Sequence, residues 1–330
     1  MENKALVIIP YFGKLPSWFQ LFLDSCNDTK LLDFLLITDD RTEFDFPDNF
    51  IIKYKTFEEE KKLYQLKLGD VYLGHPYKLC DYKPAFGFVY ELDKTQYTYW
   101  GYCDVDIIFG DIDCFLSEHF KKGFDKLFTY GHLAFYRNSL EINSIFKSNI
   151  LKGISNFKYV SHTTYPNNFD EIGIRNILLF YGFKVVENQY FENVNVNFRN
   201  FAIGNGQPRV PQLILKTRND LQVLEQNSSR KILYIHFMWR KDLKVECDRL
   251  SDYIICVDGF LSFDSQKKER LFIKYGKNED CYEQNIYKKW LKNYISKNKR
   301  ERFNRELRTF HFKGIMNIVV RYLSIKNILK

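Results

Sequence analysis

The sequence of 330 residues has no long apolar run and few cysteines. No stretch approaches the roughly 20 apolar residues that a membrane-spanning helix requires. The apolar run at residues 5–10 is too short for the core of a signal peptide, so we expect a cytoplasmic protein. The seven cysteines are odd in number, scattered and without a CxxC pair, which is typical of reduced thiols and excludes a disulfide framework or a zinc knuckle.

Positive charge is concentrated at one end of the chain. The net charge is +8, but residues 286–330 contain 13 Lys or Arg against two Glu, which leaves a net −3 for residues 1–285. A basic region at one end indicates a local contact with an anionic membrane, or amphipathic helices that pack on the rest of the protein. Nucleic acid is not an expected partner, because the main part of the chain is net acidic.

Buried strands and helices alternate in the first part of the chain. Residues 5–9 and 31–38 are apolar runs of the kind buried in a parallel sheet, and residues 17–26 between them have helical spacing. Such a βαβ unit binds ligands at the carboxyl ends of its strands, so we expect an α/β fold. The pattern further predicts helices at 57–68, 83–92 and 170–181, strands at 97–102, 126–137, 232–237 and 254–257, and a loop at 193–211.

Two carboxylates, Asp104 and Asp106, follow the strand predicted at 97–102. One residue apart in extended backbone, they point to the same face and can together hold a divalent cation with a diphosphate. Acidic triplets are also common on solvated turns. The residues on both sides are apolar here, however, and buried carboxylates need a partner such as a metal ion. Metal binding is therefore the favoured interpretation.

Several motifs in combination resemble a family of bacterial GT-A-like glycosyltransferases associated with capsule and surface-polysaccharide gene clusters. They are IPYFG at 9–13, YKLCDYKPAFG at 77–87, WGYCDVD at 100–106, GDI at 110–112 and GH at 131–132. The resemblance covers about residues 5–240 and implies a GT-A-like, Rossmann-type mixed sheet flanked by helices. It also implies transfer of a sugar from a nucleotide-sugar donor, a UDP-sugar, to a saccharide or lipid-linked saccharide acceptor.

The same resemblance implies a division of the chain. Residues 1–264 would form the catalytic domain, with a nucleotide-sugar-binding half at about 1–113 and an acceptor half at about 114–264. Residues 265–330 would be a basic, amphipathic helical C-terminal region. The enzyme would then be cytoplasmic, with peripheral contact to the inner face of the plasma membrane through that region.

The resemblance assigns the metal ligands. Asp106 would bind Mn²⁺ or Mg²⁺ directly, and Asp104 would contact the metal or the ribose of the donor. His236, at the end of the strand at 232–237, resembles the histidine that completes the metal shell, and imidazole suits Mn²⁺ better than Mg²⁺. The alternative is a histidine with no metal role, whose ring nitrogens are hydrogen-bonded within the protein.

Asp170 and Glu171 begin the helix at 170–181, where similar inverting enzymes place the base that takes the acceptor's proton. Acidic residues also simply favour a helix N-terminus, and a retaining enzyme would need no such base. His132 and Tyr136 are candidates for the acceptor side. The other candidates would bind the donor, with solvated loop charge as the alternative for the charged ones: Pro10, Tyr11, Gly13, Asp39, Lys78, Asp81, Lys83 and Arg240.

Two other functional classes fit the sequence less well. A sugar nucleotidyltransferase would need a glycine-rich phosphate loop, but residues 10–13 are aromatic, and neither GxGxxG nor GxxxxGK[ST] follows the first strand. A non-catalytic module for saccharide or nucleic acid would have cations interleaved with aromatics on the main part of the chain, which is instead net acidic. We therefore predict a metal-dependent, inverting hexosyltransferase, with a retaining enzyme of the same fold as the alternative.

Overall fold

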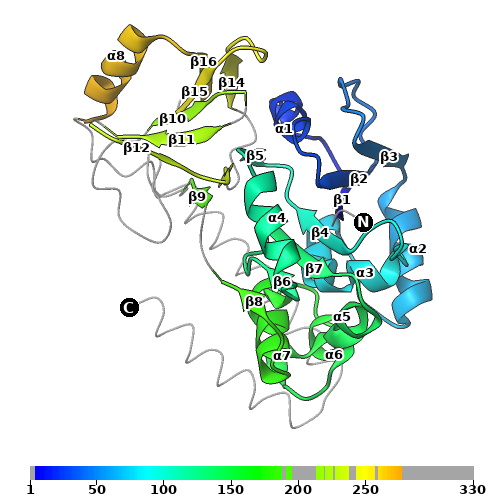
Figure 1. The fold of residues 1–330 in the computed structure, drawn as a ribbon. Helices are drawn as coiled ribbons and strands as arrows, with labels where there is room; N and C mark the ends of the chain where they lie inside the picture. Colours follow the sequence, from blue (N-terminus) through cyan, green and yellow to red (C-terminus); the bar gives the residue numbers. More distant parts are fainter. Residues whose placement is uncertain are drawn as a thin grey trace, which may run out of the picture.

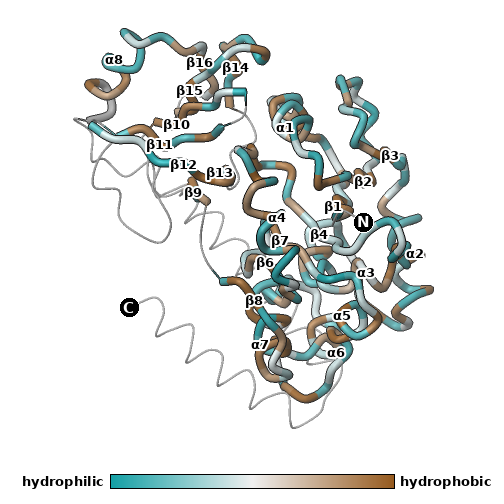
Figure 2. The backbone as a smooth tube through the Cα atoms, viewed as in Figure 1, coloured by the Kyte–Doolittle hydropathy of each residue, from teal (hydrophilic) through white to brown (hydrophobic). Residues whose placement is uncertain are grey.

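The computed structural model describes residues 4–187, 191–194, 213–218, 220–225, 227–237, 243–256 and 259–276. Within these residues the fold is mixed α/β, with three sheets and helices around them (Figure 1). Apolar stretches run through the strands, and polar stretches lie on many of the outer turns (Figure 2). Most of the basic C-terminal region predicted at 265–330, from residue 277 onward, and most of the predicted loop at 193–211 lie outside the described residues.

The largest sheet has seven strands in the order β3-β2-β1-β4-β7-β6-β8. β1 (Ala5–Tyr11) pairs in parallel with β2 (Leu32–Thr38) and β4 (Tyr99–Cys103), and β2 pairs in parallel with β3 (Phe50–Tyr54). α1 (Phe19–Cys26) connects β1 to β2, which confirms the predicted βαβ unit. Since β1 and β4 are parallel neighbours, the segments that follow them emerge at the same edge of the sheet.

The other half of this sheet contains antiparallel pairs. Two short strands lie there, where the sequence predicted one long strand at 126–137. β7 (Leu133–Arg137) pairs antiparallel with β4 and with β6 (Lys126–Leu127), while β8 (Val185–Val186) pairs in parallel with β6. The chain reverses after β6, where Phe128 has a φ of 64°. A single strand at 126–137 was therefore wrong, because two short strands of apolar residues pair with each other across this reversal.

One helix that covers the sheet agrees with prediction and another differs from it. α2 (Phe57–Leu68) has the predicted bounds and begins with a capping box between Thr56 and Glu59. The helix predicted at 83–92 is instead a 3₁₀ segment, η1 (Pro76–Ala85), followed by the short α3 (Phe86–Val89). The remaining short helices are α4 (Asp113–Lys121), α5 (Leu140–Ser144), η2 (Ile145–Lys147), η3 (Gly153–Ser155) and α6 (Phe157–Val160).

The helix predicted at 170–181 begins with a wider turn. η4 (Phe169–Gly173) is a π-turn, in which the N–H groups of Ile172 and Gly173 both point to the carbonyl of Asn168. α7 (Ile174–Phe180) continues from it. π-turns are frequent at functional sites, and this one contains the acidic pair that the sequence singles out.

A three-stranded sheet brings distant segments to the acidic motif. β13 (Tyr234–His236) pairs antiparallel with β5 (Ile107–Phe109) and in parallel with β9 (Phe191–Asn193). In this register His236 lies opposite Ile107, the residue that follows Asp106. The strand predicted at 232–237 is thus confirmed, and its pairing places its histidine beside the motif.

A six-stranded sheet lies on the α1 side of the molecule (Figure 1). Trp18, just before α1, contacts the rings of Phe237 and Phe260 at centroid distances of 4.7 and 5.3 Å. No described helix is long and apolar enough to cross a membrane. In order across the sheet, the strands are β12 (Ser229–Lys231), β11 (Leu221–Leu224), β10 (Leu213–Lys216), β15 (Tyr253–Cys256), β16 (Gly259–Ser262) and β14 (Lys244–Glu246), and α8 (Ser265–Gly276) follows β16.

Candidate active site

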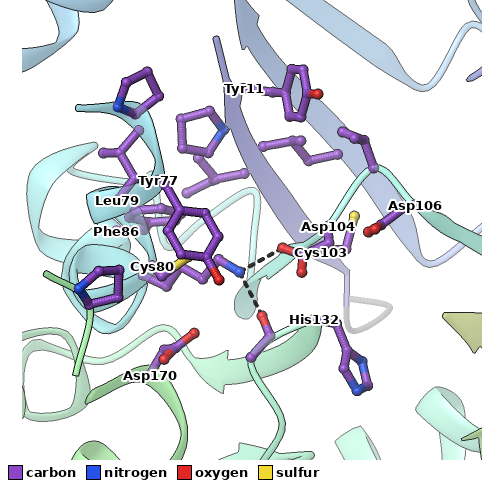
Figure 3. Close-up of a pocket in the computed structure, with 18 of the residues that line it drawn as sticks. Tyr11, Tyr77, Leu79, Cys80, Phe86, Cys103, Asp104, Asp106, His132 and Asp170 are labelled. Carbon is purple, nitrogen blue, oxygen red and sulfur yellow. Dashed lines mark hydrogen bonds and ion pairs between the residues drawn. The ribbon is translucent and has the colours of Figure 1, made fainter. Parts of the chain in front are cut away.

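A cavity of about 500 Å³ opens at the carboxyl ends of β1 and β4. Its wall comes from the loop after β1, from η1, from the turn between β4 and β5, and from η4. Figure 3 shows Asp104 and Asp106 on one side of the cavity and Asp170 across from them. Nine residues predicted from the sequence line it: Pro10, Tyr11, Lys83, Asp104, Asp106, His132, Asp170, Glu171 and His236.

Asp104, Asp106 and His236 form a compact group of ligands, here called the metal triad. Each offers one ligand atom, and these atoms lie within 4.8 Å of one another. The Nε2 atom of His236 is 3.5 Å from Oδ1 of Asp106 and 4.0 Å from Oδ2 of Asp104. Neighbouring ligands of an octahedral cation with bonds of about 2.1 Å lie about 3 Å apart. Two carboxylates and an imidazole at these separations therefore fit a divalent cation after small side-chain movements.

Asn193 orients the imidazole of the triad. Its Oδ1 lies 2.8 Å from Nδ1 of His236, a contact in which Nδ1–H is the donor. Nε2 then keeps its lone pair on the side that faces the two carboxylates. Metal-binding histidines are commonly fixed by such a hydrogen bond from their second ring nitrogen. Asn193 was not predicted from the sequence, because only the pairing of β9 with β13 brings it to His236.

Lys83 neutralises one side of Asp104. Its Nζ donates to Oδ1 of Asp104 at 2.6 Å and to the carbonyl of Gly131 at 2.7 Å, as the dashed lines in Figure 3 show. Burial by itself would lower the pKa of Lys83, but the carboxylates of Asp104 and Asp170 outweigh it and raise the pKa. Lys83 is therefore a permanent cation in the cavity wall.

Asp170 is a buried carboxyl group at the cavity, with 5% of its surface exposed. Burial raises its pKa well above the ordinary value, and Glu171, Asp81 and Asp104 add to this, whereas Lys83 opposes it. Glu171 is anchored, because its Oε1 accepts a hydrogen bond of 2.9 Å from the N–H of Gly131. The acidic pair therefore contains one carboxyl group that favours its protonated form and one that holds the neighbouring loop.

The carboxylate groups of Asp170 and Glu171 leave no room for a side chain at Gly131. A Cβ atom there would lie 2.5 Å from Oδ2 of Asp170 and 3.1 Å from Oε1 of Glu171. Glycine at this position allows the loop before β7 to approach the acidic pair closely. The GH motif at 131–132 thus has a physical role at the cavity.

His132, the second residue of that motif, lies against the metal triad. Its ring stacks on His236 with centroids 4.3 Å apart, and its Nδ1 is 3.2 Å from the hydroxyl of Tyr234. Burial, together with the neighbouring His236 and Lys83 side chains, holds the pKa of His132 well below the ordinary value. The sequence predicted an acceptor contact for His132, and the structure places it beside His236.

Lys78 and Asp81 lie below the cavity and do not line it. Both side chains are fully buried, and Nζ of Lys78 is 2.6 Å from Oδ2 of Asp81. The carboxylate of Asp81 also accepts hydrogen bonds from the N–H groups of Asn167 and Phe169, directly before Asp170. Their geometry shows no contact surface for a donor, and they instead hold the segment that leads into η4.

Three other predicted residues that the structure describes, Gly13, Asp39 and Tyr136, are not in the cavity wall. The N–H of Gly13 donates to Oδ1 of Asp39 at 2.7 Å, which joins the loops after β1 and β2. Tyr136 is 1% exposed and stacks on Trp100 at 4.5 Å inside the core. Arg240 lies outside the described residues.

Some residues of the cavity wall were not predicted as site residues from the sequence. Tyr77 and Pro166 line it from η1 and from the segment before η4. Asn168 lines it in the left-handed conformation, with a φ of 55°. Asparagine tolerates this conformation better than most residues, so an Asn just before an acidic pair is a weak local signal for the sharp turn.

The comparisons with known proteins complete this picture. No curated protein matches the sequence. Among solved structures, the apo-form glycosyltransferase GlyE of Streptococcus pneumoniae TIGR4 is similar over 59% of this chain and 47% of that chain, with 13% identity and a TM-score of 0.29. The matched region thus spans about half the length of that structure. Residues 7–264 match the model of a family of unknown function, DUF6625, and the chain belongs to this family.

Proposed function

We propose that this protein is a metal-dependent glycosyltransferase that moves a sugar from a nucleotide-sugar donor to a hydroxyl group of a saccharide or lipid-linked saccharide. The observation that carries the proposal is one cavity with the metal triad on one side and a separate buried carboxyl group, Asp170, on the other. A departing diphosphate requires positive charge, and an attacking hydroxyl requires a base. This cavity offers residues for both tasks.

The triad would bind the cation and the donor diphosphate. Asp106 and Nε2 of His236 face each other at 3.5 Å, and Asp104 turns Oδ2 toward them because Lys83 holds its Oδ1. Mn²⁺ or Mg²⁺ at this position would neutralise the charge that develops on the leaving diphosphate. Lys83 adds a fixed positive charge on the same side of the cavity.

Asp170 would accept the proton of the acceptor hydroxyl. Its burial favours the neutral form, so the ionised carboxylate is a stronger base than an exposed aspartate. Glu171 would position Asp170 through its hydrogen bond to Gly131. A base in this role implies inversion at the anomeric carbon. NMR of the newly formed product checks this, since retention of configuration would remove Asp170 from that role.

The nucleotide would lie at the end of β1. Pro10, Tyr11 and Phe12 line the cavity there, with an aromatic surface suited to a base such as that of UDP. The donor half at about 1–113 and the acceptor half at about 114–264 would meet at the cavity, which contains residues of both. These features suit a GT-A-like enzyme of surface-polysaccharide synthesis.

Thermal unfolding with nucleotide sugars tests the proposal. A ligand at about 100 times its dissociation constant adds about 2.7 kcal/mol to stability, so one nucleotide class should raise the melting temperature when Mn²⁺ is present. Asp106→Asn should abolish the Mn²⁺-dependent rise and the transfer of labelled sugar. Asp93→Asn is the matched control, because Asp93 is exposed on the turn before β4, at the opposite end of this strand from Asp106. The absence of any Mn²⁺-dependent shift across all nucleotide classes would contradict the proposal.

A further inference from the structure

Large apolar side chains are exposed together at the end of α7. Leu179, Phe180 and Tyr181 are consecutive and have 43%, 57% and 49% of their surface exposed. Ile150, with 48% exposed, is in the adjoining segment. Single exposed apolar residues are common on soluble proteins, but a contiguous group marks an interaction surface. We call these four residues the α7 patch.

Hydrogen bonds through Ser148 join the two parts of the patch. The hydroxyl of Tyr181 lies 3.1 Å from Oγ of Ser148, and that Oγ accepts a hydrogen bond from the N–H of Ile150. The rings of Phe180 and Tyr181 are edge to face at 5.3 Å. The end of α7 and the segment after η2 are therefore joined, and both lie at the lower end of the view in Figure 1.

The backbone holds this surface rigidly. The N–H of Phe183 donates to the carbonyl of Leu178 and the N–H of Gly182 donates to that of Leu179, the two hydrogen bonds of a Schellman motif. Gly182 has a φ of 75°, which this motif requires and which glycine adopts without strain. Because the chain turns back at once, Phe180 and Tyr181 project from a fixed helix end.

Exposed lysines flank the two segments of the patch along the chain. Within residues 140–187, all of them described, the exposed acidic residues are Glu141 and Glu187, and Glu187 is paired with Arg175. Four lysines are exposed in the same range: Lys147, Lys152, Lys158 and Lys184. Aromatic and aliphatic side chains with lysines at their edge are the composition of a surface that lies on anionic lipid.

We infer that the α7 patch is a docking surface for an anionic phospholipid bilayer. The aromatic pair enters the interfacial layer, and the lysines contact the headgroups. Three partners could cover this surface: an anionic bilayer, a second copy of the chain, or the segment at 286–330. The charge of the surface favours the bilayer. A second copy would oppose lysines to lysines, and the segment at 286–330 carries a net +11, so both would be repelled where an anionic surface is attracted.

This surface lies close to the cavity. Asp170 and Glu171 line the cavity immediately before α7, and a helix of seven residues is about 10 Å long. A bilayer at the far end of α7 would bring the cavity within reach of a substrate carried on a lipid. The inference concerns where the protein lies, and its test does not depend on the chemistry of the cavity.

Vesicle flotation with the full chain tests the inference. Wild-type protein should float with vesicles of phosphatidylcholine and phosphatidylglycerol in equal amounts, and not with phosphatidylcholine alone. Phe180→Ser with Tyr181→Ser should weaken binding at least about ten-fold, since two apolar contacts are lost. Lys147→Gln with Lys184→Gln should weaken it about five-fold for each lysine. Ile51→Ser with Leu66→Ser removes two exposed apolar side chains on β3 and α2 and should leave binding unchanged.

The fluorescence of a tryptophan placed in the patch reports direct contact between the patch and the bilayer. Phe180→Trp should be quenched by brominated phosphatidylglycerol beyond the quenching of the native tryptophans, and Leu66→Trp should not. The inference would be overturned if the serine and lysine variants bound vesicles as strongly as the wild type, or if the tryptophan at position 180 showed no added quenching. A change in oligomeric state in the serine variant would identify a second copy as the occupant. Faster proteolysis of residues 277–330 in that variant would instead identify that segment as the occupant.

Discussion

The ammonium group of Lys83 lies 2.6 Å from one carboxylate oxygen of Asp104, while the other oxygen lies 4.0 Å from His236. Asp104 thus divides its two oxygens between a permanent cation and the ligand group of the cavity. Lys83 also holds the carbonyl of Gly131, so a single side chain connects η1, the turn after β4 and the loop before β7. A metal ion at the triad would therefore interact both with the negative charge of Asp104 and with the nearby positive charge of Lys83.

Lys83→Met should strengthen binding of Mn²⁺ by the free protein. Removing a positive charge within a few ångströms of the ligands favours the cation, by about ten-fold for an interaction of about 1.4 kcal/mol. Transfer activity should nevertheless fall, because the charge on the diphosphate side is lost. Calorimetric titration with Mn²⁺ measures the first effect. Lys83→Arg keeps the charge and should leave Mn²⁺ affinity near that of the wild type; weaker binding by Lys83→Met would contradict the assigned geometry.

Asn193→Ala should weaken Mn²⁺ binding about 10- to 100-fold, the usual effect of removing the hydrogen bond that orients a ligating histidine. Without Oδ1 of Asn193 the ring of His236 can rotate, and Nε2 no longer faces the carboxylates. Titration of the bound fraction of Mn²⁺ by electron paramagnetic resonance measures the change. Asn193→Asp retains an acceptor oxygen and should restore most of the affinity. Unchanged affinity in the alanine variant would show that His236 is not a ligand.

Asp170→Asn should abolish transfer and raise stability at neutral and alkaline pH. The pKa of Asp170 is higher in the folded protein than in the unfolded chain, so the folded state binds more protons between the two values. Stability of the wild type therefore falls as pH rises through that window, by about 1.4 kcal/mol for each unit of separation. The asparagine variant has no carboxyl group at position 170, so its stability does not fall through this pH window for that reason. Urea unfolding should show equal stability below about pH 4 and a more stable variant at pH 8.

A lower stability of the asparagine variant at pH 8 would assign a different role to Asp170. If Asp170→Asn were less stable than the wild type at pH 8, the attraction of Lys83 for the ionised carboxylate would exceed the effect of burial. Asp170 would then be a structural partner of Lys83 and not a base.

Lys78→Met should destabilise the fold by about 3–5 kcal/mol, because it leaves the buried carboxylate of Asp81 without its cation. The Michaelis constant for the donor should change little in the folded fraction, since Lys78 does not line the cavity. Lys61→Met is the matched control. Lys61 also pairs with an acid three residues away, Glu58, but this pair is more exposed and should contribute less than about 1 kcal/mol. A large effect on donor affinity would restore the donor contact that the sequence predicted.

The sequence by itself determined the parts that depend on local chemistry. β1 begins with a continuous apolar run and β2 is apolar apart from Asp33 and Thr38, which favours buried strands, and α2 is set by its capping box and spacing. The acidic pair after β4 stands out because apolar residues flank it. The six-stranded sheet was mostly missed, because its strands have three or four residues and too little pattern to distinguish them from loop.

Only the tertiary structure decided which polar residues share a cavity. His236 reaches Asp106, and Asn193 reaches His236, through strand pairings that span many residues of chain, and no local signal encodes such pairings. Lys78 and Lys83 look alike in the sequence, yet one is sealed below the cavity and the other lines it. In a 3₁₀ helix residues three apart are eclipsed, so Lys78 falls directly on Asp81, whereas Lys83 is two positions out of that register and turns to Asp104.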